Sequence, residues 1–109
     1  MEKDPKIFLS HILENIASVE RDLEGVSKSD FKKNDLLRDA TVRRIEVIGE
    51  AAKNIPDDFK NKHSEIPWRQ IAGTRDFIVH EYFSIDIDLV WEITQKDLPD
   101  LKNKITALL

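Results

Sequence analysis

Apolar residues recur every three or four positions over long stretches of this chain, which is the spacing of one face of an α-helix. The clearest series runs through Phe8, Ile12, Ile16, Val19 and Leu23. Nowhere do polar and apolar residues alternate over the length of a strand. Because only three glycines and four prolines interrupt 109 residues, the sequence predicts an all-α protein with few, long helices.

Helix-starting and helix-ending residues divide the first half of the chain. Asp4 and Pro5 suit the N-cap and first turn of one helix, and Gly25 is placed to end it. A second helix is predicted over residues 35–54, with an apolar face wide enough to pack on more than one neighbour. Pro56 ends it, because proline cannot continue a helix.

The connections between the predicted helices are short and polar. Residues 24–34 should form one connection with at most a helical turn around Asp30, and residues 56–67 another that includes a short helix. A third long helix should begin at Pro67. Short connections favour antiparallel neighbours, so the fold class predicted is an antiparallel bundle of four to five helices forming one domain over residues 1–109.

The last predicted helix is less regular. Ser84 or Asp86 can cap it, and Pro99 should kink or break it near Leu98. Its apolar series includes one charged member, Asp97, as the following list shows: Val90, Ile93, Asp97, Leu101, Ile105 and Leu108.

The charge and composition exclude several classes of protein. The net charge of −4 argues against a protein that grips long nucleic acids through many phosphate contacts, although a nuclease needs only a local basic pocket. Six basic residues between positions 28 and 44 are interpreted as a solvated helix face. The absence of cysteine, of a long apolar run and of a signal-peptide layout predicts a cytoplasmic protein without a membrane span.

The stretch 75–82 concentrates reactive side chains in an otherwise ordinary amphipathic segment. Arg75 lies in register with Trp68, Ile71 and Ile78, on the face expected to be buried. Since an unpaired buried guanidinium is very costly, Arg75 must border a cleft, pair with an acid or lie at an interface. Asp76 and His80 are helical neighbours at four positions' distance and can form a hydrogen bond.

These residue types are sufficient for cleavage of RNA by its own 2′-hydroxyl group. A permanently charged Arg75 can hold the phosphate and stabilise the transition state. His80 can act as general base or acid, and Asp76 can orient its imidazole. No metal or other cofactor is required, and no cluster of predicted metal ligands is evident.

The spacing within the stretch favours a site made by two copies of the chain. Residues five positions apart differ by roughly 140° around a straight α-helix, so Arg75 and His80 of one helix do not converge. A twofold symmetric homodimer would bring the same surface together twice. The alternative is purely structural: Arg75 pairs with a buried acid such as Glu50, and His80 caps a helix end.

Three segments, in this order, resemble the HepT-like ribonuclease toxins of the HEPN superfamily. They are the run Arg44–Ala52 with its Ile-Gly-Glu-Ala sequence, the run Pro67–Gly73, and the R-x4-H-x-Y stretch from Arg75 to Tyr82. The resemblance covers nearly the whole chain. One departure is Asp76, where many relatives carry asparagine; an aspartate there favours a protonated His80.

The resemblance implies an α-helical homodimer whose active site lies at the dimer cleft. It implies a metal-independent endoribonuclease with Arg75 and His80 as catalytic residues, acting as the toxin of a toxin–antitoxin pair. The expected partners are RNA, with no DNA, and a nucleotidyltransferase antitoxin of the MntA type that silences the toxin by AMPylation of Tyr82. The alternative is a non-catalytic helical module that binds a nucleotide or protein and pairs with a nucleotidyltransferase.

Overall fold

The computed structural model describes residues 4–73 and 86–109, and within these ranges it is helical without strands. The elements are α1 (Pro5–Asp22), α2 (Lys28–Lys33), α3 (Asp35–Asn54), α4 (Asp57–Lys62), α6 (Ile87–Glu92), η2 (Ile93–Asp97) and α7 (Leu98–Thr106). Residues 68–73 are also helical. The all-α prediction is confirmed.

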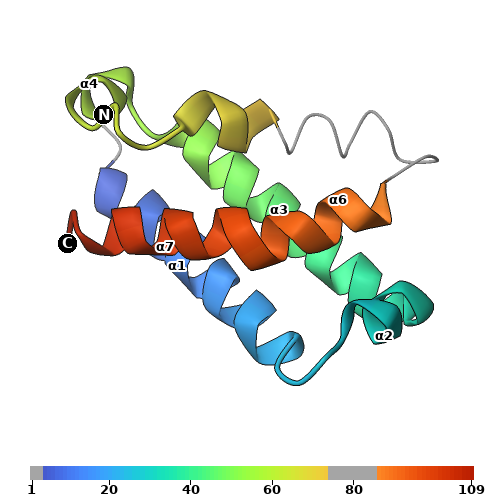
Figure 1. Ribbon diagram of the computed structural model, residues 1–109. Helices are drawn as coiled ribbons and strands as arrows, with labels where there is room; N and C mark the ends of the chain where they lie inside the picture. Colours follow the sequence, from blue (N-terminus) through green and yellow to red (C-terminus); the bar gives the residue numbers. More distant parts are fainter. Residues whose placement is uncertain (1–3, 74–85) are drawn as a thin grey trace.

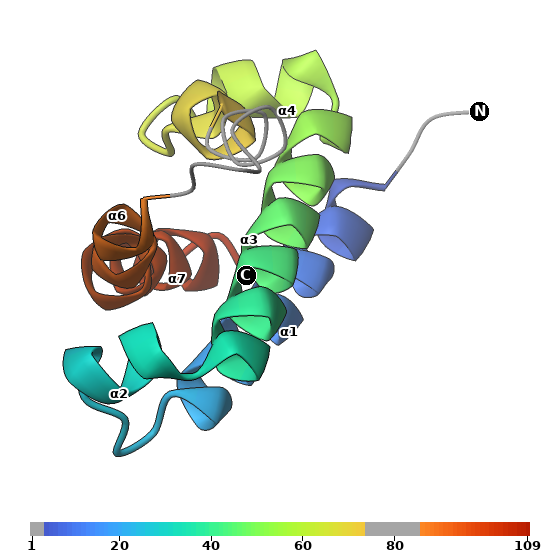
Figure 2. The same cartoon turned by 90° about the vertical axis from the view of Figure 1, so that its right-hand side faces the viewer.

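The helices form two layers. α1 and α3 run antiparallel, side by side, and make the most extensive helix–helix contact in the described structure (Figures 1 and 2). The α6–η2–α7 helix crosses this pair as the second layer. α4 and α2 lie at opposite ends of the molecule in both views.

Local capping explains why α1 begins and ends as predicted. The Asp4 carboxylate accepts a hydrogen bond from the Lys6 amide at 2.9 Å, and Pro5 occupies the first turn. Beyond the C-terminal end, Gly25 has a φ of 73°, a left-handed conformation that glycine adopts at little cost.

The bounds of α3 agree with the prediction of residues 35–54. Its N-cap is Asn34, whose side-chain oxygen accepts a hydrogen bond from the Leu37 amide at 3.1 Å. The buried face includes Ile45, Ile48 and Gly49. This face packs on α1, in agreement with the expected role of an apolar stripe.

The first polar connection holds a full short helix, α2, in place of a single turn. Phe31 is its one buried residue, and the Phe31 ring lies 5.2 Å from that of Trp91. Lys28 and Lys32 approach the Asp88 carboxylate at 3.1 and 3.2 Å. Both lysine side chains are about half exposed. Because they pair with Asp88, the basic stretch is not only a solvated face but also links α2 to α6.

The C-terminal helix contains a wide turn that the prediction missed. The Leu98 amide bonds to the carbonyl of Ile93, five residues back, so the turn η2 takes one residue more than an α-helical turn. Ile93 and Leu98 are therefore both buried, at 6% and 5% exposure. Asp97, the charged residue that interrupted the predicted apolar series, is exposed, and the buried position belongs to Leu98.

The effect of Pro99 is a distortion and not a break. In an unbroken α-helix its ring would clash with the carbonyl of Gln95. The wide turn immediately before it opens the backbone there, and the helix continues through α7 (Figure 1). The expected position of the irregularity is confirmed, but the chain keeps its direction.

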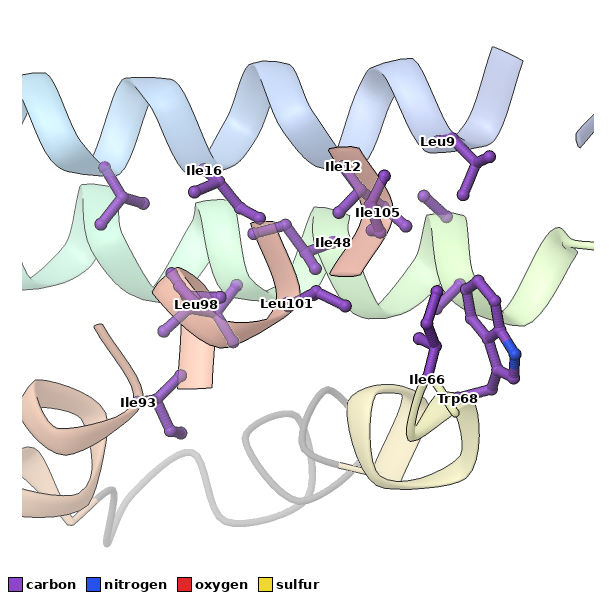
Figure 3. Close-up of a cluster of buried hydrophobic side chains, with 14 of the residues drawn as sticks. Leu9, Ile12, Ile16, Ile48, Ile66, Trp68, Ile93, Leu98, Leu101 and Ile105 are labelled. Carbon is purple, nitrogen blue, oxygen red and sulfur yellow. The ribbon is translucent and has the colours of Figure 1, made fainter. Parts of the chain in front are cut away.

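One apolar core joins the two layers and the segment before residue 74 (Figure 3). Its members from α1, α3, α7 and the neighbouring segments include Leu9, Ile12, Ile16, Ile48, Ile66, Trp68, Ile93, Leu98, Leu101 and Ile105. Each is at most 7% exposed. In the ranges 4–73 and 86–109, no helix has the length and apolar character needed to cross a membrane.

Candidate functional site

The four residues predicted to carry the chemistry lie outside the described residues. Arg75, Asp76, His80 and Tyr82 fall between positions 74 and 85. Their arrangement, and the composite site built from two copies, therefore remain predictions. The structure does show the segments on both sides of this stretch: the described chain ends at Gly73 before it and begins again at Asp86 after it.

The segment that leads into the stretch is firmly attached to the core. Ile66 and Trp68 are only 2% and 7% exposed. The Trp68 indole N–H donates a hydrogen bond to the His63 carbonyl at 3.0 Å, and its ring lies 6.3 Å from that of Phe59. The first residue of helical residues 68–73 is thus held in place by the core and by a hydrogen bond.

The segment that follows the stretch is attached by polar contacts. The Asp86 carboxylate caps α6 by accepting a hydrogen bond from the Leu89 amide at 3.2 Å. Two residues on, hydrogen bonds from Lys28 and Lys32, together with their positive charges, lower the pKa of the Asp88 carboxyl. Of the two predicted caps, Asp86 is the one the described structure shows.

The α3 segment that carries the Ile-Gly-Glu-Ala run points its apolar residues inward. Ile48 and Gly49 are buried, whereas Glu50 is exposed and accepts a hydrogen bond from Asn54 at 3.5 Å. Arg44 donates to the side chain of Asn15 on α1 at 3.2 Å. Glu50 is thus exposed within the described structure, and whether it pairs with Arg75 stays open because Arg75 lies outside the described residues.

One side of helical residues 68–73 borders a cleft of about 510 Å³, which we call the acidic cleft. Its apolar floor includes Ile48 and Ile71, and its charged wall consists of Glu65, Asp97, Asp100 and Lys104. Lys104 is paired with Asp100 at 3.0 Å. Among the described lining residues, three carboxylates against one ammonium disfavour the binding of a phosphate.

The surroundings of Asp97 in the acidic cleft change the pKa of its carboxyl. Although Asp97 is exposed, the partial loss of water around its carboxyl raises its pKa, the negative charges of Glu92 and Asp100 raise it further, and Lys96 opposes them. The raised pKa means that the site disfavours additional negative charge.

The other side of the same helix borders a shallow hollow of about 830 Å³, which we call the polar groove. It extends to Gly73, and the polar residues of its described lining are Asp57, Lys60, Asn61, Ser64, Arg69 and Gln70. Its described lining therefore holds two cations and one carboxylate, and two amides add further donors. Lys60 and Arg69 gave no signal in the sequence, because single basic residues nine positions apart are brought together only by the fold.

The two histidines in the described ranges have structural surroundings. The His63 ring stacks on Phe59 with centroids 4.4 Å apart, and its Nδ1 lies 3.5 Å from Glu65. His11 meets Phe8 edge to face at 6.4 Å. Within the described part of the chain, no group of three histidines or acids is arranged to hold a metal ion.

Comparison with known proteins identifies a family. The model of the family described as "Ribonuclease HepT-like" matches residues 12–108. The chain is 44% identical over 109 residues to "Gamma-glutamylcyclotransferase and putative RNase MJ0434" of Methanocaldococcus jannaschii, covering 100% of this chain and 49% of that protein. It thus spans about half the length of that relative. No solved structure matches the chain.

Two other relatives are of nearly the same length as this chain. It is 41% identical over 107 residues to "Putative RNase TTE0752" of Caldanaerobacter subterraneus subsp. tengcongensis, covering 98% of this chain and 96% of that protein. It is 40% identical over 108 residues to "Probable ribonuclease HepT" of Thermococcus cleftensis, covering 99% of this chain and 98% of that protein. The chain belongs to the HepT-like ribonuclease family of the HEPN superfamily.

Proposed function

We propose that this protein is an endoribonuclease whose chemistry is carried by Arg75 and His80. The observation that carries the proposal is the family match over residues 12–108, together with full-length relatives named as ribonucleases. The residue types in the stretch 75–82 supply what the reaction needs. The chain is also anchored to the core immediately before this stretch, through Trp68.

The reaction proceeds by attack of a ribose 2′-oxygen on the adjacent phosphorus. A neutral His80 imidazole accepts the 2′-hydroxyl proton as the new O–P bond forms, and a protonated imidazole donates a proton to the leaving 5′-oxygen as its bond to phosphorus breaks. Arg75 binds the non-bridging oxygens, which carry more negative charge in the transition state. The products are a 2′,3′-cyclic phosphate and a 5′-hydroxyl end.

Two copies of the chain supply these roles together. One His80 would act as base and the second as acid, and the pair would flank one phosphate at a twofold axis. Asp76 orients the imidazole and favours its protonated form. The spacing of Arg75 and His80, roughly 140° apart on a straight helix, is what supports a composite homodimeric site.

Control of the activity follows from the toxin–antitoxin resemblance. A nucleotidyltransferase antitoxin of the MntA type would transfer AMP from ATP to the Tyr82 hydroxyl, with release of pyrophosphate. The adenylate would add a negative charge and bulk two residues from His80, where the RNA phosphate must bind. The γ-glutamylcyclotransferase activity named for the longer relative is not assigned to this chain, because that protein has about as much chain again beyond the matched part.

The test is incubation of the purified protein with mixed RNA in the presence of EDTA. We expect cleavage to 2′,3′-cyclic phosphate ends by the parent chain, and its loss in His80→Ala and Arg75→Ala variants with unchanged circular dichroism. His11→Ala is the matched control, because it removes an exposed imidazole from α1 and should leave cleavage intact.

The contrary result is equally clear. A parent protein that mass spectrometry shows to be unmodified at Tyr82, that is dimeric, and that leaves RNA uncut would overturn the nuclease proposal in favour of the binding module. DNA of the same sequence should stay uncut in all cases, because it lacks the 2′-hydroxyl nucleophile.

A further inference from the structure

We propose that the polar groove binds the phosphates of RNA nucleotides that flank the cleaved bond. The inference rests on the proposed ribonuclease function and assigns Lys60 and Arg69 as substrate-binding residues. They would act on RNA at a distance from the reacting groups, and they would increase affinity for longer substrates. Neither residue belongs to the R-x4-H-x-Y stretch from Arg75 to Tyr82, although Arg69 lies in the Pro67–Gly73 run that precedes it.

The position of the groove supports this assignment. Its lining extends along helical residues 68–73 as far as Gly73, and Arg75 follows Gly73 by two residues in the sequence. A Cβ atom at Gly73 would meet no atom within 4 Å, so this end of the groove is open. A strand bound by residues close to Gly73 in the sequence would need only a short reach to contact the groove.

Charge distinguishes the groove from the acidic cleft on the other side of the same helix. In the described lining, the acidic cleft has three carboxylates and one ammonium, whereas the groove has two cations and one carboxylate, Asp57. In a protein with a net charge of −4, such a local basic surface is where a polyanion binds. Charge thus favours RNA on the groove side of helical residues 68–73 over the side of the acidic cleft.

The groove's side chains also have the chemistry of phosphate recognition. The exposed Arg69 guanidinium offers a planar fork of donors. The Lys60 ammonium donates to the Lys53 carbonyl at 3.4 Å, and an ammonium has three donors in all. Asn61 and Gln70 add amide groups to the same lining. Contacts of this kind position a strand without reading its sequence.

Buried residues fix the position of the segments that line the groove. Trp68 and Ile66 belong to its lining and are also members of the apolar core. The indole hydrogen bond to His63 fixes the start of helical residues 68–73 against the end of α4. The two cations, one on α4 and one on this helix, thus project from elements with a fixed separation, which reduces the ordering cost of binding.

The test measures binding apart from cleavage. The probe is a fluorescein-labelled, mixed-sequence 2′-O-methyl oligoribonucleotide, which lacks the nucleophile, and its affinity is followed by anisotropy across a series of salt concentrations. The variants are Lys60→Gln, Arg69→Gln and the double variant. Lys33→Gln is the matched control, because it removes one exposed positive charge from α2 at the opposite end of the molecule.

The expected effect follows from counterion release. For single strands the logarithm of affinity falls with the logarithm of salt by about 0.7 per phosphate contact, so each lost contact weakens binding about fivefold at 0.1 M salt, and two weaken it about 25-fold. The salt slope should fall by about 0.7 in each single variant and about 1.4 in the double variant. Lys33→Gln should leave the slope unchanged.

The outcomes separate this inference from the ribonuclease proposal. Equal slopes for the parent and the double variant overturn the inference, even if the parent cleaves RNA. A parent that binds no probe overturns it as well. A reduced slope in the Lys60 and Arg69 variants, with a parent that does not cleave, supports the groove while the ribonuclease proposal fails. An equal reduction in Lys33→Gln would show general charge attraction and also overturn the inference.

Discussion

Trp68 connects the apolar core to the segment that precedes the predicted catalytic stretch, and its replacement tests how that connection is made. Trp68→Phe keeps an aromatic ring but removes the indole N–H that donates to the His63 carbonyl at 3.0 Å. The same carbonyl also accepts a hydrogen bond from the Ile66 amide at 3.2 Å. The carbonyl therefore keeps one partner in the variant.

The size of the loss can be calculated from these contacts. The missing hydrogen bond should cost about 1 kcal/mol, and the smaller ring about 1 kcal/mol more in lost apolar burial. The total of about 2 kcal/mol is well below the 3–5 kcal/mol expected for roughly complete truncation by Trp68→Ala. If the His63 carbonyl lost all its hydrogen-bond partners, the loss of stability would increase by about 1–3 kcal/mol. The Ile66 amide prevents this, because it still donates to that carbonyl.

Urea unfolding followed by far-ultraviolet circular dichroism measures the difference, at one protein concentration because self-association would shift the midpoint. With a slope of about 2 kcal/mol per molar urea, Trp68→Phe should lower the midpoint by about 1 M. Trp91→Phe is the matched control, since that indole packs on Phe31. A loss of 4 kcal/mol or more, on the order of full truncation, would refute the reasoning about the shared carbonyl.

Further predictions concern α2, the acidic cleft and two glycines. Phe31→Ala should cost about 3–5 kcal/mol in urea unfolding, because Phe31 is 0% exposed, whereas Lys32→Gln should cost under about 1 kcal/mol as half of an exposed ion pair. Since the folded state raises the pKa of Asp97 above its ordinary 3.8, its ionisation destabilises the fold as pH rises above that value. Asp97→Asn should therefore raise the unfolding midpoint at neutral pH, and this gain should vanish in acid. Gly25→Ala, at a φ of 73°, should cost about 1–2 kcal/mol in the same unfolding assay. Gly73→Ala, which meets open space, should be neutral or stabilise by up to about 1 kcal/mol.

The sequence was most informative where structure depends on neighbours along the chain. Capping residues and prolines are local signals, and they located α3 correctly and the start of α1 at Pro5. The apolar series of α1 correctly predicted that Ile12, Ile16 and Val19 are buried, because a regular helix repeats with a constant angle per residue. It also included Phe8, which is only partly buried, and omitted the buried Leu9. The family resemblance, resting on three short segments, was also correct.

Features that depend on distant residues were not predictable. Nothing near Lys28 indicates that it contacts Asp88, sixty positions further on. The wide turn at η2 disturbs the constant angle on which apolar series rely, so the series passed through Asp97, which interrupted it, and omitted the buried Leu98. The catalytic assignment of Arg75 and His80 is still a chemical expectation drawn from residue types and their order.

The wide turn also has a consequence for how much length variation the C-terminal helix tolerates. η2 holds one residue beyond what an α-helical turn requires. Removal of Gln95 would leave the residues now numbered Ile93 and Leu98 four positions apart, which is again one face of an ordinary α-helix. Combined with Pro99→Ala, such a deletion would keep every buried side chain of α7 on the core side, whereas a deletion in the middle of α1 would turn half of that helix outward.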